Sequence, residues 1–76
     1  RVAALCWDQL VGNTMAVLAK TRPSPLSRYP EPIARRKVER HVRRLCQSNV
    51  PTELAPSQLQ SIHQALMQEA SMGSRR

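Results

Sequence analysis

The stretch Pro32-Ile-Ala-Arg-Arg-Lys-Val-Glu-Arg-His-Val-Arg-Arg-Leu-Cys46 combines a strong positive charge with a helical spacing of apolar residues. It contains six of the twelve basic residues of the chain and a single acid, Glu39. Its apolar residues recur at steps of three and four, which is the spacing of one face of an α-helix. We therefore expect a helix over about residues 32–47, with a narrow apolar side that packs inward and a broad cationic side. The apolar side consists of Ala34, Val38, Val42, Leu45 and Cys46.

The cationic side of this helix is the first candidate binding surface. An arginine guanidinium donates two parallel hydrogen bonds to a phosphate or a carboxylate, so a row of arginines suits an acidic ligand. The whole chain carries a formal charge of +7 at pH 7, which favours nucleic acid, an acidic protein segment or an anionic membrane surface as the partner. A solvated face that only keeps a small domain in solution is the plain alternative. The candidate residues are Arg35, Arg36, Lys37, Arg40, Arg43 and Arg44.

Residues 2–20 predict a first helix that is apolar on nearly every side, since Asp8 is the only charged residue before Lys20. Two other short helices can cover about half of such a surface, so we expect the remainder to contact a partner. Gly12 lowers the stability of this helix by about 1 kcal/mol relative to alanine. A close helix crossing or a kink would explain the glycine at this position; otherwise it has no special role. The candidate partner-binding residues are Leu5, Trp7, Val11, Met15 and Leu18.

A proline-rich connector follows the first helix, and a third helix closes the chain. Prolines restrict the backbone of the residues before them, so residues 21–32 predict a stiff connector. Residues 57–71 predict the third helix, because Ser57 and Gln60 match a capping box and apolar residues then recur at helical spacing. The apolar stripe of this helix is Leu59, Ile62, His63, Leu66, Met67 and Ala70.

Together these patterns predict an all-α fold: one compact three-helix domain over residues 1–76, with the proline-rich connector between helices 1 and 2. Because the chain starts at Arg1 rather than at methionine, we expect it to be part of a larger protein. No run approaches the roughly 20 consecutive apolar residues of a membrane span, so we expect no span.

The residues that carry catalysis or bind metals are sparse. His41 and His63 are the only histidines, the five acids are scattered, and no glycine-rich phosphate loop exists. We therefore expect a protein that is not an enzyme and that holds no cofactor and no metal. Cys6 and Cys46 lie among apolar neighbours and are interpreted as reduced core residues, although a bridge between them stays open. The basic helix and the low cysteine content favour an intracellular and nuclear location.

Two functions remain for such a domain. The first is a protein–protein interaction module, in which surplus apolar surface of the first helix binds an acidic amphipathic segment that the arginine-rich helix steers into place. Self-association through the same surface is a variant of this hypothesis. The alternative is a domain that binds the backbone of duplex DNA or structured RNA through the basic helix, which has no aromatic residue for base stacking and no Asn or Gln for base readout. Binding to a membrane surface ranks last, because the apolar side has no Trp, Phe or Met to insert.

Overall fold

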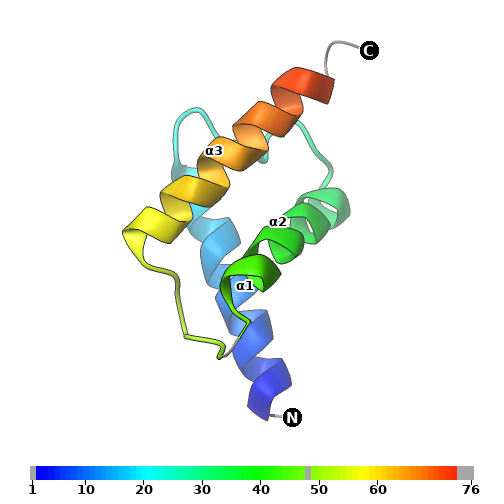
Figure 1. Ribbon diagram of the computed structural model, residues 1–76. Helices are drawn as coiled ribbons and strands as arrows, with labels where there is room; N and C mark the ends of the chain where they lie inside the picture. The colour runs from blue at the N-terminus through cyan, green and yellow to red at the C-terminus, as the bar shows by residue number, and fades with distance from the viewer. Residues whose placement is uncertain (1, 48, 74–76) are drawn as a thin grey trace.

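The computed structural model describes residues 2–47 and 49–73, and for residues 2–5, 72 and 73 it describes the backbone alone. The chain forms three helices, α1 (Val2–Lys20), α2 (Glu31–Leu45) and α3 (Pro56–Gly73), as Figure 1 shows. The described residues contain no strand, and the Cα radius of gyration is 12.3 Å. The prediction of an all-α, compact three-helix domain is therefore confirmed.

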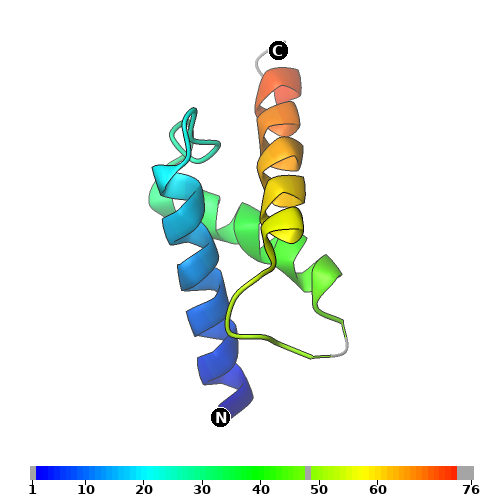
Figure 2. The same cartoon turned by 90° about the vertical axis from the view of Figure 1, so that its left-hand side faces the viewer.

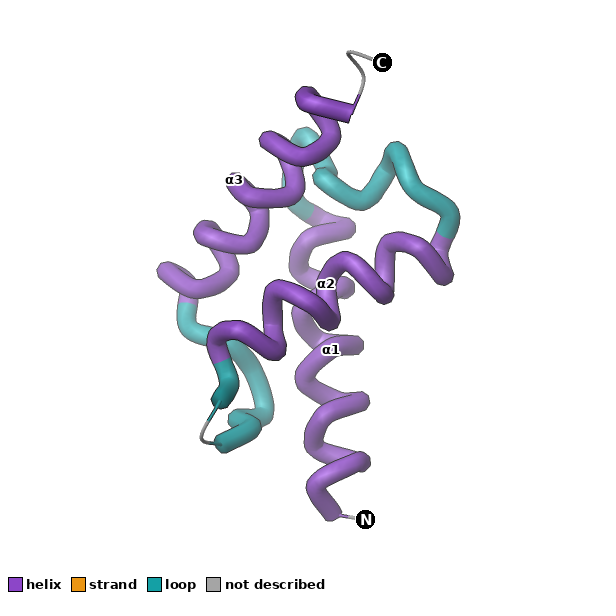
Figure 3. The backbone as a smooth tube through the Cα atoms, turned by 45° about the vertical axis from the view of Figure 1, so that its right-hand side comes forward, coloured by secondary structure: helices purple, strands orange, loops and turns teal. Residues whose placement is uncertain are grey.

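The helix α2 crosses the other two helices on one side of the molecule. In Figure 2, α1 and α3 rise side by side while α2 passes behind both. In Figure 3, α2 lies in front of α1, and no other described element covers its outer side. The first turns of α1 extend beyond α2 and α3 in all three views. This arrangement leaves one side of α2 facing away from the rest of the domain.

The core forms where the apolar sides of the three helices meet. It contains residues from every helix and one from the linker between α2 and α3, because each helix repeats its apolar residues at steps of three and four. Thr14 is the buried polar residue of this region, and its hydroxyl donates to the Leu10 carbonyl oxygen at 2.8 Å, so its burial leaves no unpaired donor. The core cluster consists of Leu10, Val11, Leu18, Val38, Val42, Leu54, Ile62 and Leu66.

Both ends of α2 differ by one or two residues from the predicted 32–47. The helix begins at Glu31 and ends at Leu45. Cys46 takes the position after the helix, and its N–H donates to the Val42 carbonyl oxygen at 3.0 Å. Asn49 does not adopt the left-handed conformation that would make it a helix cap, since no described residue other than glycine has a positive φ.

The start of α3 corrects the predicted capping box. Pro56 is the first helical residue, a position where its missing N–H is not needed. The side chain that reaches back is Gln58, whose Oε1 accepts the N–H of Ala55 at 2.9 Å. The motif therefore lies two residues before the Ser57–Gln60 pair that the sequence pattern indicated.

The connector between α1 and α2 packs on α3 instead of looping into solvent. Pro25 is fully buried, and Leu26 packs against the core. The Nε2 atom of His63 lies 3.1 Å from the carbonyl oxygen of Pro23, which ties α3 to the connector. These contacts fix the point at which α2 begins, and through it the direction of the helix across α1.

Gly12 has no packing role in this fold. A Cβ atom added to Gly12 would have no other heavy atom within 4 Å apart from its neighbours and its own helix backbone. The close helix crossing that would have explained this glycine is therefore not present at this position.

Candidate functional site

The two sides of α2 have opposite chemistry. Ala34, Val38 and Val42 are buried against α1 and α3. Because each residue advances a helix by about 100°, residues two positions from these point away from the core. We call this exposed side the outer face. It consists of Arg36, Arg40 and Arg44, together with Arg43, which is also exposed and lies nine residues after Ala34, on the opposite side of the helix.

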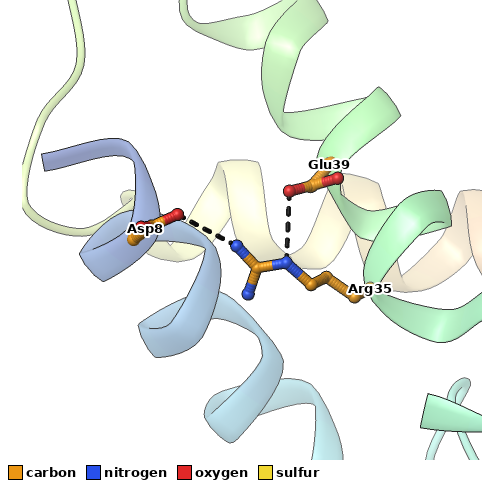
Figure 4. Close-up of polar contacts among 3 residues, drawn as sticks. All are labelled: Asp8, Arg35 and Glu39. Carbon is orange, nitrogen blue, oxygen red and sulfur yellow. Dashed lines mark hydrogen bonds and ion pairs between the residues drawn. The ribbon is translucent and has the colours of Figure 1, made fainter. Parts of the chain in front are cut away.

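On the side of α2 that adjoins α1, Arg35 is held by two carboxylates, as Figure 4 shows. Its Nη2 lies 3.1 Å from Oδ1 of Asp8, and its Nε lies 3.2 Å from Oε2 of Glu39. The planar guanidinium thus joins α1 to α2 and also makes an ion pair within α2. Each of these partly exposed ion pairs contributes at most about 1 kcal/mol to stability. Their larger effect is to neutralise Arg35.

On the side of α2 that adjoins α3, Glu69 neutralises a second cation. Its Oε1 lies 3.6 Å from Nζ of Lys37, and its Oε2 lies 3.0 Å from Nε2 of His41. The Lys37 ammonium also lies 4.9 Å from the centroid of the Tyr29 ring, at a cation–π distance. Lys37 is therefore enclosed by a carboxylate and an aromatic ring.

The six predicted basic residues thus separate into two groups. Arg35 and Lys37 face Asp8, Glu39 and Glu69 at the two helix junctions. The four arginines of the outer face make no ion pair within residues 2–47 and 49–73. Asp8, Glu39 and Glu69 are used at the sides of α2 and Glu31 lies in its first turn, so the positive charge of the helix is concentrated on the outer face.

One arginine of the outer face also touches α1. The guanidinium carbon of Arg43 lies 5.3 Å from the centroid of the Trp7 ring, within the range of a cation–π contact. Trp7 is partly buried and packs against the core. The contact restricts the direction of Arg43 without neutralising its charge.

The predicted partner-binding residues of α1 are largely internal. Val11 is 0% exposed and Leu18 is 1% exposed, so both belong to the core, and Trp7 and Met15 pack against it. The side chain of Leu5 lies outside the described part of the chain. None of the four predicted side chains that the structure describes is fully exposed, and Leu54 of the linker and Leu26 of the connector belong to or pack against the same core cluster.

The exposed large apolar side chains lie elsewhere. Val17 of α1 is 44% exposed, while Ile33 and Leu45 at the two ends of α2 are 45% and 39% exposed. The apolar spacing predicted Leu45 on the inner side of the helix, which its exposure corrects, and gave no prediction for Ile33. The position of Ile33, three residues before Arg36, was the available signal for placing it beside the outer face.

Other site types find little support in the described residues. Within residues 2–47 and 49–73, no three His, Cys, Asp or Glu side chains gather closely enough to hold a metal ion. Cys6 and Cys46 are both free. No helix in the described part of the chain has the length and apolar character required to cross a membrane.

Comparison with known proteins gives no further assignment: no protein-family model, no curated protein and no solved structure matches this chain significantly.

Proposed function

We propose that this chain is a non-enzymatic binding domain that holds the phosphate backbone of a nucleic acid on the outer face of α2. The observation that carries the proposal is the separation of charges around this helix. Asp8, Glu39 and Glu69 lie at its two sides, and four arginines without a carboxylate partner in the described chain share its exposed face. A fold that needed these arginines for stability would pair them, so they are available to a ligand.

The dimensions of the outer face suit a repeating anion. Arg36, Arg40 and Arg44 follow one another at steps of four residues, which is roughly 6 Å along the helix axis for each step. Each arginine that contacts a phosphate displaces a condensed counterion from the nucleic acid. Four such contacts predict that the logarithm of the binding constant falls with the logarithm of the salt concentration with a slope of about −3.6.

The composition of the face favours duplex over single strand. Binding of single strands relies on aromatic rings on which bases stack. The two aromatic residues, Trp7 and Tyr29, each lie against a cation of α2, and both are partly buried. The outer face contains no Asn or Gln for paired hydrogen bonds to adenine, so we expect binding that depends little on sequence. A nuclear location would agree with this ligand.

A fluorescence-anisotropy titration with labelled duplex DNA and hairpin RNA, at several salt concentrations, tests the proposal. We expect binding that persists at physiological salt and that is lost in the double variant Arg36→Glu with Arg40→Glu. The matched control is Lys20→Glu with Arg28→Glu, which changes the net charge equally at exposed positions outside α2. Binding that falls equally in both double variants would show a general charge effect and would contradict a site on the outer face.

A second candidate is the binding of an acidic amphipathic protein segment to the same face. The observation that favours it is the exposure of Ile33 and Leu45, which add apolar contacts at the two ends of the arginine row. An acidic amphipathic segment would make ion pairs with the arginines and apolar contacts with Ile33 and Leu45. Replacing Ile33 and Leu45 by alanine should then weaken an acidic amphipathic peptide and leave duplex binding unchanged.

A further inference from the structure

We infer that the C-terminal end of α2 is a site for the terminal phosphate group of a nucleic-acid strand, so that the domain prefers phosphorylated ends. The inference rests on the proposed function and names the part of the ligand that this end of the outer face recognises. It comes from an open depression of about 500 Å³ at this end of α2. The depression is lined by Arg40, Arg43, Arg44, Cys46 and Gln47.

The lining suits a phosphate monoester better than a diester. A monoester carries a charge of about −1.5 to −2 at neutral pH and presents three oxygen acceptors, whereas each internal phosphate of the backbone carries a single charge. Arg40, Arg43, Arg44 and Gln47 line one space, so three guanidinium groups and an amide lie within reach of a single bound group. Charge-assisted hydrogen bonds from several guanidinium groups to one phosphate gain most when the phosphate carries the higher charge.

Among residues 2–47 and 49–73, no acidic side chain competes for these arginines. The described lining of the depression contains no carboxylate, and Glu39 on the neighbouring turn is directed to Arg35. Burial raises the pKa of the Cys46 thiol above its usual range, so this group is neutral at pH 7. The remaining negative contribution is the carboxyl end of the α2 dipole, a partial charge that the arginines of the last turn, Arg43 and Arg44, offset.

One of the three arginines is also held in place. The contact of Arg43 with the Trp7 ring restricts the long side chain before any ligand arrives. A side chain that is already restricted loses less conformational entropy on binding. The depression therefore has a fixed side at Arg43 and exposed arginines, Arg40 and Arg44, that can close on the phosphate.

The outer face beyond the depression indicates which molecule carries the phosphate. Arg36 lies roughly 12 Å from Arg44 along the helix axis, outside the depression but on the same exposed row. A strand whose terminal phosphate occupies the depression can place a following phosphate at Arg36. A phosphorylated protein segment offers one phosphate and leaves the rest of the row without a ligand.

The test compares one short duplex in two forms, with a 5′-phosphate or a 5′-hydroxyl at its ends and a fluorophore at one 3′-end. We expect the 5′-phosphate form to bind about tenfold more tightly at physiological salt. The variant Arg44→Gln should reduce this ratio to about one, because Arg44 lines the depression. The control Arg36→Gln should weaken both forms by a similar factor and preserve the ratio. Both residues are exposed and without ion pairs in the described chain, so neither variant should affect folding.

The outcomes separate this inference from the proposed function. Equal binding of the two forms by the unchanged protein would overturn the inference and leave backbone binding intact. A preference that survives in both Arg44→Gln and Arg40→Gln would show that the depression does not cause it. A peptide with one phosphoserine that binds more tightly than the 5′-phosphate duplex would contradict the ligand class. Absence of binding to either duplex would overturn the proposed function and this inference together.

Discussion

The inner and outer sides of α2 belong to the same fifteen residues and have opposite relations to the fold. On the inner side, Ala34, Val38 and Val42 are enclosed by other helices, so their size and polarity are set by packing. On the outer side, Arg36, Arg40 and Arg44 contact no described acid and contribute little to stability. The charge on the outer side is therefore not explained by packing or pairing within the fold, which favours a role in binding.

The largest expected effect comes from placing the same acid on each side of α2. Val38→Asp buries an unpaired carboxylate in the core and should lower the free energy of unfolding by about 4 kcal/mol. Arg36→Asp places it in solvent two residues away and should cost less than about 1 kcal/mol, from helix propensity. Urea denaturation followed by far-UV circular dichroism measures both changes. Similar losses in the two variants would mean that the outer side also packs against something.

The next largest effect concerns binding. Arg36→Glu with Arg40→Glu reverses two charges on the outer face and should reduce affinity for duplex at least about 100-fold, since each lost charge-assisted contact is replaced by repulsion. The free energy of unfolding, measured by urea denaturation, should change by no more than about 0.5 kcal/mol, as expected for surface substitutions. A variant that loses binding and stability in parallel would show that the two sides of α2 are not independent.

A substitution in α1 should change stability by a smaller amount and leave binding unchanged. Gly12→Ala should raise the free energy of unfolding by about 0.5–1 kcal/mol, because the site has space for a Cβ and alanine restricts the unfolded chain. Affinity for duplex should not change, since Gly12 lies on α1 and not on the outer face. Thermal and urea unfolding measure the gain. A loss of stability would indicate a packing role for this glycine.

The smallest expected effect comes from removing an acid beside α2, which tests whether such acids reduce the positive charge available for binding. Asp8→Asn removes one carboxylate from Arg35 and should lower the free energy of unfolding by about 0.5 kcal/mol or less. The released charge should tighten duplex binding by a small factor, about twofold to threefold at low salt, and by less as salt screens it. The anisotropy titration detects this change. Weaker binding in Asp8→Asn would mean that the Arg35–Asp8 pair orients α2 for its ligand.

The inner side of α2 was predictable from the sequence, and the division of its basic residues was not. Local spacing alone placed Val38 and Val42 in the core, because a helix that packs on one side must bury the residues at steps of three and four. The sequence did not separate Arg35 and Lys37 from the outer face. Their carboxylate partners Asp8 and Glu69 lie on other helices, and only the tertiary fold brings them to α2.

The apolar surface of α1 shows a second limit of local patterns. The sequence identified a helix that is apolar on most sides, but the amount of covering it receives depends on connectors that have no periodicity. Leu26 and Leu54 come from such segments; Leu54 belongs to the core cluster that contains Val11 and Leu18, and Leu26 packs against that cluster. The predicted capping box was wrong because α3 begins at Pro56, a residue that suits the first helical position, so Ser57 lies inside the helix and cannot cap it.

The contact between Arg43 and Trp7 has an optical consequence. Trp7 is the only tryptophan of the chain, and a cation from the proposed binding face lies against its ring. Indole emission depends on the charges and polarity next to the ring, so a phosphate that binds beside Arg43 should change the intensity and wavelength of that emission. The domain therefore has its own fluorophore at the edge of its candidate site, and the intrinsic tryptophan fluorescence of the unlabelled protein should report ligand binding there.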